Sequence, residues 1–339
     1  MQAKVAQHQS ELPWLFLVVL ISALAFRNVH GFHGEWEALI DAAVGVTEGR
    51  PHWRAFQNRL LGPYTVHGIA VLGFSLKQSV LIFTAGMLLI HNLMLYRLLH
   101  SYVSSIKSLL MICLWSYGFL VFQCDWLYVW DMIDINIFTL ASFVIVFERR
   151  PTFLLFLYPV ALINRESALY LPLAYIIVTV IPPIINAKNW RELPIKKTVI
   201  KVAFGTSLMI IGIFYTYYVR NHLFIESSWG GKDMGNPMLL GNQSHWLVQI
   251  QSLVFGNFSN GNIIHTVTLW IALAYVLMLL LSVRQSGILA GGVFFLSLLA
   301  GIISFGVLNE TRLLFPLMSL LIFLVVANLK RKEKLNCDH

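Results

Sequence analysis

The sequence contains few charged residues. Of its 339 residues only 12% are Asp, Glu, Lys or Arg, whereas 58% are hydrophobic. A soluble globular protein carries about 25% charged residues, so this chain has too little polar surface to remain in solution as a single globule. The composition excludes an ordinary soluble domain and indicates that most of the chain is solvated by a lipid bilayer.

Cysteine is also scarce. Cys113 lies in an apolar run, Cys124 at the end of another and Cys337 in the tail, so the three do not easily pair and no disulfide framework is expected. Internal repeats, low-complexity tracts and a nucleotide-binding motif are absent as well. The formal net charge is +8, but the basic residues are spread among short loops, which is typical of membrane topology signals and not of nucleic-acid binding.

Long apolar runs fill the rest of the chain. Only helices and closed barrels satisfy their backbone groups inside lipid, and unbroken runs without alternation favour helices. We therefore predict an all-α bundle of about ten transmembrane helices, each near 20 residues long, without a soluble domain. The first run is expected to be a retained helix, because no small-x-small cleavage site follows it. The predicted segments are residues 13–29, 78–98, 108–124, 132–148, 152–164, 168–186, 199–218, 264–283, 287–307 and 313–329. 

The fifth segment is short for a full crossing, and residues 63–76 are apolar but interrupted by His67, Gly68 and Gly73, so they lie either in the interface or within the protein. Placing the N-terminus inside makes every short inner loop basic, as the positive-inside rule requires. Residues 1–339 then form one integral membrane domain with both termini in the cytoplasm. Two long loops, residues 27–77 and 219–263, fall on the outer face.

The first outer loop gathers acidic residues that are rare elsewhere. Glu35, Glu37 and Asp41 are candidates for a general base or for ligands of a divalent cation. Glu37 and Asp41 share one face if residues 35–46 form a short helix; the alternative is a solvated helix whose acids only face water. With His30 and His33 the acids offer zinc-ligand chemistry, but the spacing matches no strong zinc signature.

Three arginines lie where the chain enters or leaves the bilayer on the outer side. Arg59 belongs to FQNRLLGPY, Arg165 to NRESALYLP and Arg312 to NETRLLFPL. Ionisable groups at membrane depth are expensive and usually face a cavity or a partner, and the planar guanidinium suits phosphate. The alternative is that these side chains extend into the headgroup layer. Asn164, Glu166 and Glu310 are candidate supporting residues beside them.

A third outer connection carries Asp125, Asp131 and Asp134 among aromatic residues. The aromatics are typical of an interfacial belt. Asp134 lies one turn inside its predicted helix, which indicates a polar cavity.

The chain resembles the GT-C superfamily of polytopic glycosyltransferases. The motifs that carry this resemblance are EWEALID, FQNRLLGPY, NRESALYLP and NETRLLFPL. The resemblance implies transfer of a sugar from a polyprenyl-phosphate carrier to a glycan, lipid or protein acceptor, in a bacterial inner membrane with the active site outside. Glu35 and Glu37, or Asp41, would be the catalytic acids, and Arg59, Arg165 and Arg312 would bind the donor phosphate. The resemblance implies no definite cofactor, and a divalent cation held by the outer acids is the one candidate.

Two other functions remain open. A polysaccharide polymerase or ligase also uses outer arginines on lipid-linked glycans. A transporter or lipid flippase is a different class, disfavoured because repeated halves are not evident and the ionisable residues gather at the outer boundary.

Overall fold

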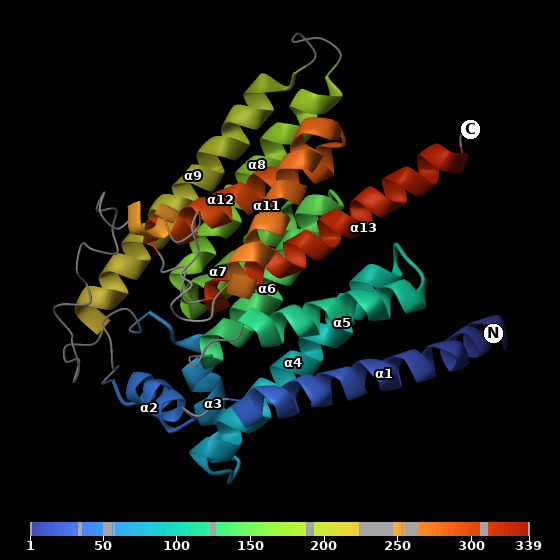
Figure 1. Ribbon diagram of the computed structural model, residues 1–339. Coiled ribbons are helices and arrows are strands. Elements are labelled where there is room, and N and C mark those ends of the chain that lie inside the picture. The colour runs from blue at the N-terminus through green and yellow to red at the C-terminus, as the bar shows by residue number, and fades with distance from the viewer. Residues whose placement is uncertain are drawn as a thin grey trace.

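A computed structural model describes residues 2–32, 36–49, 56, 58–122, 127–187, 193–223, 247–251, 254, 263–305 and 311–337. Every regular element within these ranges is helical and none is a strand (Figure 1). Along the chain the elements are α1 (Gln2–Phe32), α2 (Trp36–Thr47), α3 (Leu61–Val71), α4 (Leu76–His100), α5 (Ser105–Phe122), α6 (Val129–Val146), α7 (Thr152–Asn164), η2 (Glu166–Leu169), α8 (Tyr170–Asn186), α9 (Ile195–Tyr218), η4 (Val219–Leu223), α11 (Ile263–Ser282), α12 (Ser286–Phe305), η7 (Thr311–Leu314) and α13 (Phe315–Cys337).

The predicted all-helical architecture is confirmed for the described residues. Eight helices are long and apolar enough to cross a membrane, and two more apolar helices, Thr152–Asn164 and Thr266–Ser282, are shorter. These ten correspond in order to the ten segments expected from the sequence, including the short fifth one. The number of actual crossings stays a prediction, because α7 and the part Thr266–Ser282 of α11 are shorter than the eight long helices.

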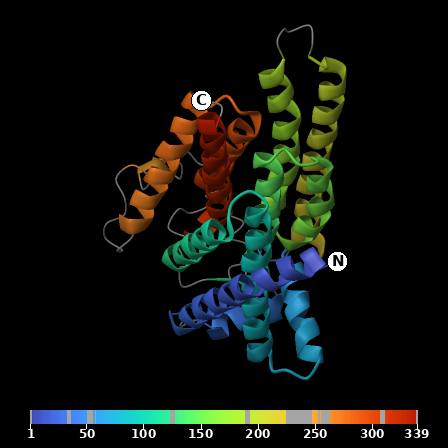
Figure 2. The same cartoon turned by 90° about the vertical axis from the view of Figure 1, so that its right-hand side faces the viewer.

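Helix α6 is the centre of the bundle. In its apolar stretch 89% of the residues are buried inside the protein, whereas in that of α9 only 11% are buried. Helix α6 packs against α3, α4, α7, α8, α12 and α13, so other helices cover most of its surface. In contrast, α9 packs mainly on α8, and Figures 1 and 2 show the two side by side at the edge.

Hydrogen bonds between side chains lock three helices together inside this core. Thr139 of α6 donates to Ser319 of α13 at 2.7 Å, and the indole of Trp115 in α5 donates to the same hydroxyl at 3.2 Å. All three side chains are fully buried. Buried polar groups must find partners, because an unsatisfied one costs about 1–3 kcal/mol, so this triad aligns α5, α6 and α13.

The apolar stretch that the sequence left ambiguous forms α3, which folds back beside α4. The turn between them is closed at Gly73, whose φ of +102° favours glycine. Ser75 then caps α4: its hydroxyl accepts from the Gln78 N–H at 3.3 Å while the Gln78 side chain accepts from the Ser75 N–H at 2.9 Å.

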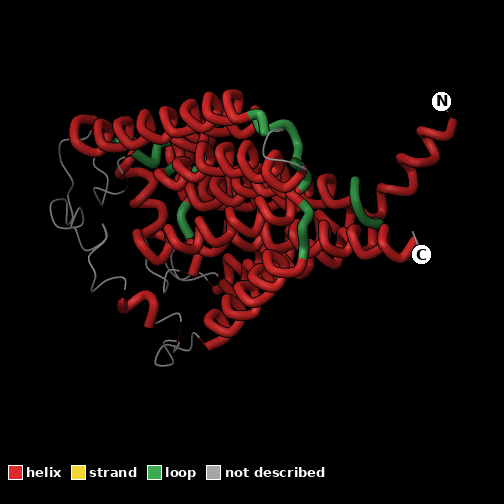
Figure 3. The backbone as a smooth tube through the Cα atoms, turned by 90° about the horizontal axis from the view of Figure 1, so that it is seen from above, coloured by secondary structure: helices red, strands yellow, loops and turns green. Residues whose placement is uncertain are grey.

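Both chain termini lie on one side of the bundle (Figures 1 and 3). Ion pairs gather on that side, between Glu11 and Arg97 at 2.8 Å and between Lys107 and Glu333 at 2.7 Å. Arg312 precedes α13 and Glu333 lies near its end, so these two residues are separated by almost the whole helix, about 1.5 Å per residue. A second set of charges therefore occupies the opposite side.

Candidate functional site

Seven charged side chains from five separate regions of the chain meet at this opposite side. They come from the ends of helices, where the chain breaks between apolar segments: Arg59 precedes α3, Asp131 and Asp134 open α6, Arg165 and Glu166 join α7 to η2, Arg220 lies on η4, and Arg312 lies on η7. We call this set the ionic cluster.

Asp131 is the central carboxylate of the ionic cluster. Its Oδ1 accepts a 2.6 Å hydrogen bond from Nη1 of Arg165, and its Oδ2 lies 3.6 Å from Nε of Arg312. Oδ2 also accepts a 3.0 Å bond from the backbone N–H of Tyr128. An acidic residue in the first turn of a helix is stabilised by the free N–H groups and by the helix dipole. Asp131 therefore caps α6 and holds two arginines at once.

The position of Arg165 follows from a break between α7 and α8. Arg165 adopts an extended conformation with φ −168° and ψ 156°, which ends α7 and starts η2. Asn164, fully buried, donates a 2.9 Å bond to the carbonyl of Trp130. Ser167 donates to both carboxylate oxygens of Asp134, at 2.8 and 2.9 Å. The sequence NRES thus fixes this corner against α6 on both sides of the arginine.

Glu166 organises the other half of the ionic cluster. Its Oε1 accepts from Nη2 of Arg59 at 3.1 Å and lies 3.4 Å from Nη2 of Arg220. Its Oε2 accepts from the Asn58 amide at 3.2 Å, while the Asn58 carbonyl accepts from Nε of Arg220 at 3.1 Å. Glu166 is thus surrounded by two cations and one amide.

Two features bring Arg59 to this place. The backbone N–H of Leu60 donates to the carbonyl of Ile163 at 2.9 Å, which ties the start of α3 to the end of α7. Gly62 lets α3 approach α6 closely, because a Cβ at this position would lie 3.0 Å from the backbone nitrogen of Trp130. Burial lowers the pKa of the Arg59 guanidinium from its usual value, and the Glu166 carboxylate opposes that shift; arginine remains charged in proteins.

Aromatic rings cover the guanidinium groups. Arg59 lies 4.8 Å from the ring centroid of Phe56 and 5.0 Å from that of Trp130, and Arg312 lies 4.8 Å from that of Tyr128. Cations over aromatic faces gain more when they are desolvated. Two aromatic residues of the expected interfacial belt, Tyr128 and Trp130, thus pack against arginines of the ionic cluster.

The structure brings together several residues that the sequence singled out separately. Arg59, Arg165 and Arg312 all belong to the ionic cluster, and Glu166 and Asn164 support it as expected. The sequence placed Asp131 and Asp134 in the third outer connection, and only Asp134 indicated a polar cavity. Arg220 was not singled out at all, although it continues the buried stripe of α9 through Gly212 and Thr216.

The proposed catalytic acids lie apart from these contacts. Glu37 and Asp41 are both exposed on the outer face of α2, whose other face is buried through Trp36, Leu39 and Val46. Among the described residues no ion pair includes Glu37 or Asp41. Glu35 and Glu310 lie outside the described residues, as does most of the loop 219–263. No group of three metal-ligating side chains occurs within the part of the chain that the structure describes.

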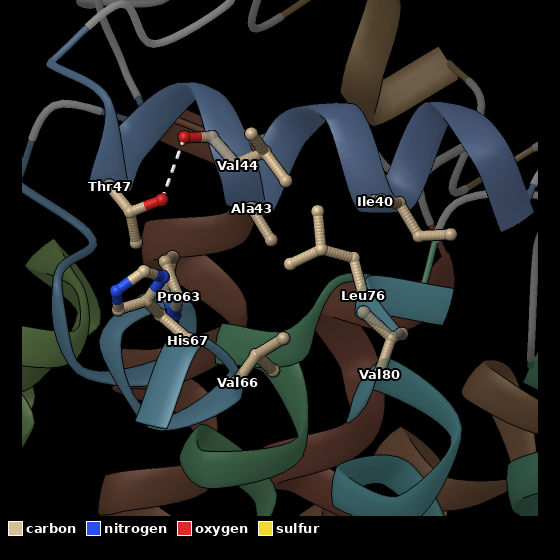
Figure 4. Close-up of a pocket in the computed structure, with 9 residues that line it drawn as sticks. All are labelled: Ile40, Ala43, Val44, Thr47, Pro63, Val66, His67, Leu76 and Val80. Atoms are coloured by element: carbon tan, nitrogen blue, oxygen red, sulfur yellow. Dashed lines mark hydrogen bonds between the residues drawn. The ribbon is translucent and has the colours of Figure 1, made fainter. Parts of the chain in front are cut away.

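A small apolar pocket lies under α2. Residues of α2, α3 and the start of α4 line it, and Figure 4 shows Val66, Leu76 and Val80 pointing towards α2. His67 and Thr47 are its polar members, and the Thr47 hydroxyl donates to the Val44 carbonyl at 2.9 Å. No residue of the ionic cluster lines this pocket.

The charge balance of the ionic cluster decides what it can bind. Four arginines face three carboxylates, so the described side chains leave one formal positive charge. Buried charges are expensive unless they are paired. One negative charge would balance these described side chains, and guanidinium groups bind phosphate and carboxylate through paired N–H donors.

Comparison with known proteins adds no relative: no protein-family model, curated protein or solved structure matches this chain.

Proposed function

We propose that the chain is a membrane glycosyltransferase of GT-C type, which moves a sugar from a polyprenyl-phosphate donor to an acceptor on the non-cytoplasmic face of a bacterial inner membrane. One observation carries this proposal: among the described residues, four arginines and three acids are held together at the ends of apolar helices. Such a site favours an anionic group attached to a lipid, since the apolar helices around it suit the bilayer.

Transfer of the sugar requires that the departing polyprenyl phosphate be stabilised. The acceptor oxygen forms a bond to the anomeric carbon, and the bond from that carbon to the phosphate oxygen breaks with its electron pair remaining on the phosphate. Negative charge grows there as the bond breaks. Fixed cations in a water-poor site stabilise such charge strongly, because they need no reorganisation during the reaction. Arg59, Arg165 and Arg312 are proposed for this role.

The acceptor proton needs a base. Glu35, Glu37 and Asp41 remain the proposed source, with Glu37 and Asp41 exposed on α2 and accessible to an acceptor. A divalent cation held by these acids is part of the same proposal. The carboxylates of Asp131 and Glu166 already accept hydrogen bonds from arginines, so in this scheme they hold the arginines in place and do not act as the base.

Reconstitution tests the proposal. The purified chain in lipid nanodiscs is given a radiolabelled polyprenyl-phosphate sugar and a cell-envelope acceptor fraction, and labelled product is separated by chromatography. Product that depends on Arg165, and not on the exposed Arg284, supports the transferase. Absence of product across a panel of donors, together with movement of lipid-linked glycan between leaflets, would replace it with a flippase. Joining of whole glycan repeats would indicate a polymerase or ligase.

A further inference from the structure

The arginines of the ionic cluster differ in their access to solvent. The side chains of Arg59, Arg312 and Arg165 are 7%, 8% and 11% exposed, whereas that of Arg220 is 30% exposed. Among the carboxylates, Glu166 is 32% exposed and Asp131 only 3%. The accessible side of the ionic cluster is therefore the pair of Arg220 and Glu166, and a ligand entering from there meets these groups first.

Charge agrees with this difference in access. Within the described residues four arginines face three carboxylates, which leaves one formal positive charge. Arg220 is the most exposed of the four arginines, so an anion drawn to this charge reaches Arg220 first.

The contacts of Arg220 leave it able to exchange partners. Its Nε donates to the Asn58 carbonyl at 3.1 Å, a neutral contact that fixes the plane of the guanidinium. Its Nη2 lies 3.4 Å from Oε1 of Glu166, which already accepts a closer bond from Arg59 at 3.1 Å. Glu166 therefore keeps Arg59 and the Asn58 amide if Arg220 turns its terminal nitrogens to another anion.

The local backbone places Arg220 for this exchange. It lies on η4, a π-helical turn that follows α9 directly. Single π-turns are frequent at functional sites. Val219 beside it is buried and Tyr218 before it is exposed, so Arg220 lies at the boundary between the bundle and its surroundings.

We propose that Arg220 is the entry contact for the phosphate: its guanidinium exchanges Glu166 for a polyprenyl phosphate and so sets the affinity for the phosphorylated donor. This inference rests on the proposed function, of which it names a further binding residue. Glu166 acts as the competitor that occupies Arg220 in the empty site.

Equilibrium binding tests the inference without needing the sugar or the acceptor. The full chain is purified in phosphatidylcholine nanodiscs, which carry no net charge, and titrated with geranylgeranyl phosphate; geranylgeraniol is the uncharged comparison. We expect Arg220→Gln to weaken phosphate binding at least tenfold, Arg220→Lys to weaken it less, and the exposed Arg284→Gln to leave it unchanged. Binding of geranylgeraniol should be the same in all four proteins.

A second variant separates recognition from folding. Glu166→Gln keeps the shape of the side chain but removes the competing charge, so it should tighten phosphate binding severalfold in the wild-type background and have no such effect together with Arg220→Gln. Wild-type selectivity for the phosphate over the alcohol, retained fully in Arg220→Gln, would overturn the role of Arg220 while leaving the proposed function intact. Absence of that selectivity in wild type would overturn the phosphate site, and with it the proposed function.

Discussion

Arg165 and Asp131 form the shortest ion pair of the ionic cluster, 2.6 Å from Nη1 to Oδ1. Both side chains are buried, and the pair joins the break after α7 to the first turn of α6. Removing one partner of a buried pair leaves an uncompensated charge, which costs about 3–5 kcal/mol. The pair therefore holds α6 and α7 together in the bundle and is also part of the candidate site.

The first prediction concerns the ion pair between Arg165 and Asp131. Asp131→Asn should lower the free energy of unfolding by about 3 kcal/mol or more, because Arg165 and Arg312 lose their shared carboxylate. The midpoint of thermal unfolding in detergent measures the effect. Asp41→Asn is the matched control, since Asp41 is exposed on α2 and surface changes usually stay within about 0.5 kcal/mol. Equal midpoints for the two variants would contradict the buried pair.

The second prediction concerns catalysis by the arginines. Arg165→Ala and Arg312→Ala should each slow transfer by about 10²–10³-fold, as the loss of one donor to a developing anion does. Arg165→Lys keeps the charge but loses the planar donor fork, so it should retain part of the activity. Rates are compared at saturating donor, with Arg284→Ala as control. A loss that appears only in the donor KM would show that these residues bind the ground state and not the transition state.

The outer acids are tested separately. Changing Glu37 or Asp41 to its amide should abolish transfer while the protein still inserts and folds, because proton abstraction by a positioned base contributes roughly 10²–10⁴-fold. Both are exposed, so stability should hardly change. Full activity in a variant with Glu35, Glu37 and Asp41 all neutralised would show that the base lies elsewhere.

Membrane topology gives a fourth prediction. Lys196 lies in the first turn of α9, and Ser228 follows the helix in the loop 219–263. A helix of this length, about 1.5 Å per residue, is long enough to cross the bilayer. In a background without the three native cysteines, a membrane-impermeant thiol reagent added outside intact cells should label Ser228→Cys and not Lys196→Cys. Labelling of both from the same side would contradict the assigned orientation.

The last prediction concerns helix packing. A Cβ at Gly287 would lie 2.2 Å from the carbonyl oxygen of Val146, a backbone atom that cannot turn away, so Gly287→Ala should lower stability by about 1–3 kcal/mol. Gly86 in α4 has nothing within 4 Å of its Cβ position, and Gly86→Ala should be neutral or slightly stabilising. Thermal unfolding of both variants in the same detergent provides the comparison.

The helices were largely predictable, because about 20 consecutive apolar residues have few other uses in a protein. The position of α6 in the centre was not, since its apolar content resembles that of the peripheral α9. What distinguishes them is small: α6 carries Asn136, whose amide donates to the Met87 carbonyl of α4 at 3.3 Å, whereas the Ser207 hydroxyl of α9 donates to the Ala203 carbonyl of its own helix.

The candidate site was predicted in part. Arg59, Arg165 and Arg312 stand at breaks between apolar segments, and this placement is readable from the sequence alone. Their convergence on Asp131 and Glu166 depends on how the helices pack, which no local pattern specifies. Arg220 had a weak signal, its spacing from Gly212 and Thr216 along α9, but a single arginine at a helix end is usually an interfacial residue.

The shared carboxylate of Asp131 also bears on how the protein is made. Its hydrogen-bonding partner Arg165 follows it by 34 positions, and Arg312 directly precedes the last helix. Asp131 is therefore synthesised well before either arginine. Because an unpaired acid is expensive near the lipid interior, α6 is poorly suited to enter the membrane by itself. The hairpin of α6 and α7 is the smallest unit that brings its own counter-charge, and the finished site has to wait for the final helix to leave the translocon.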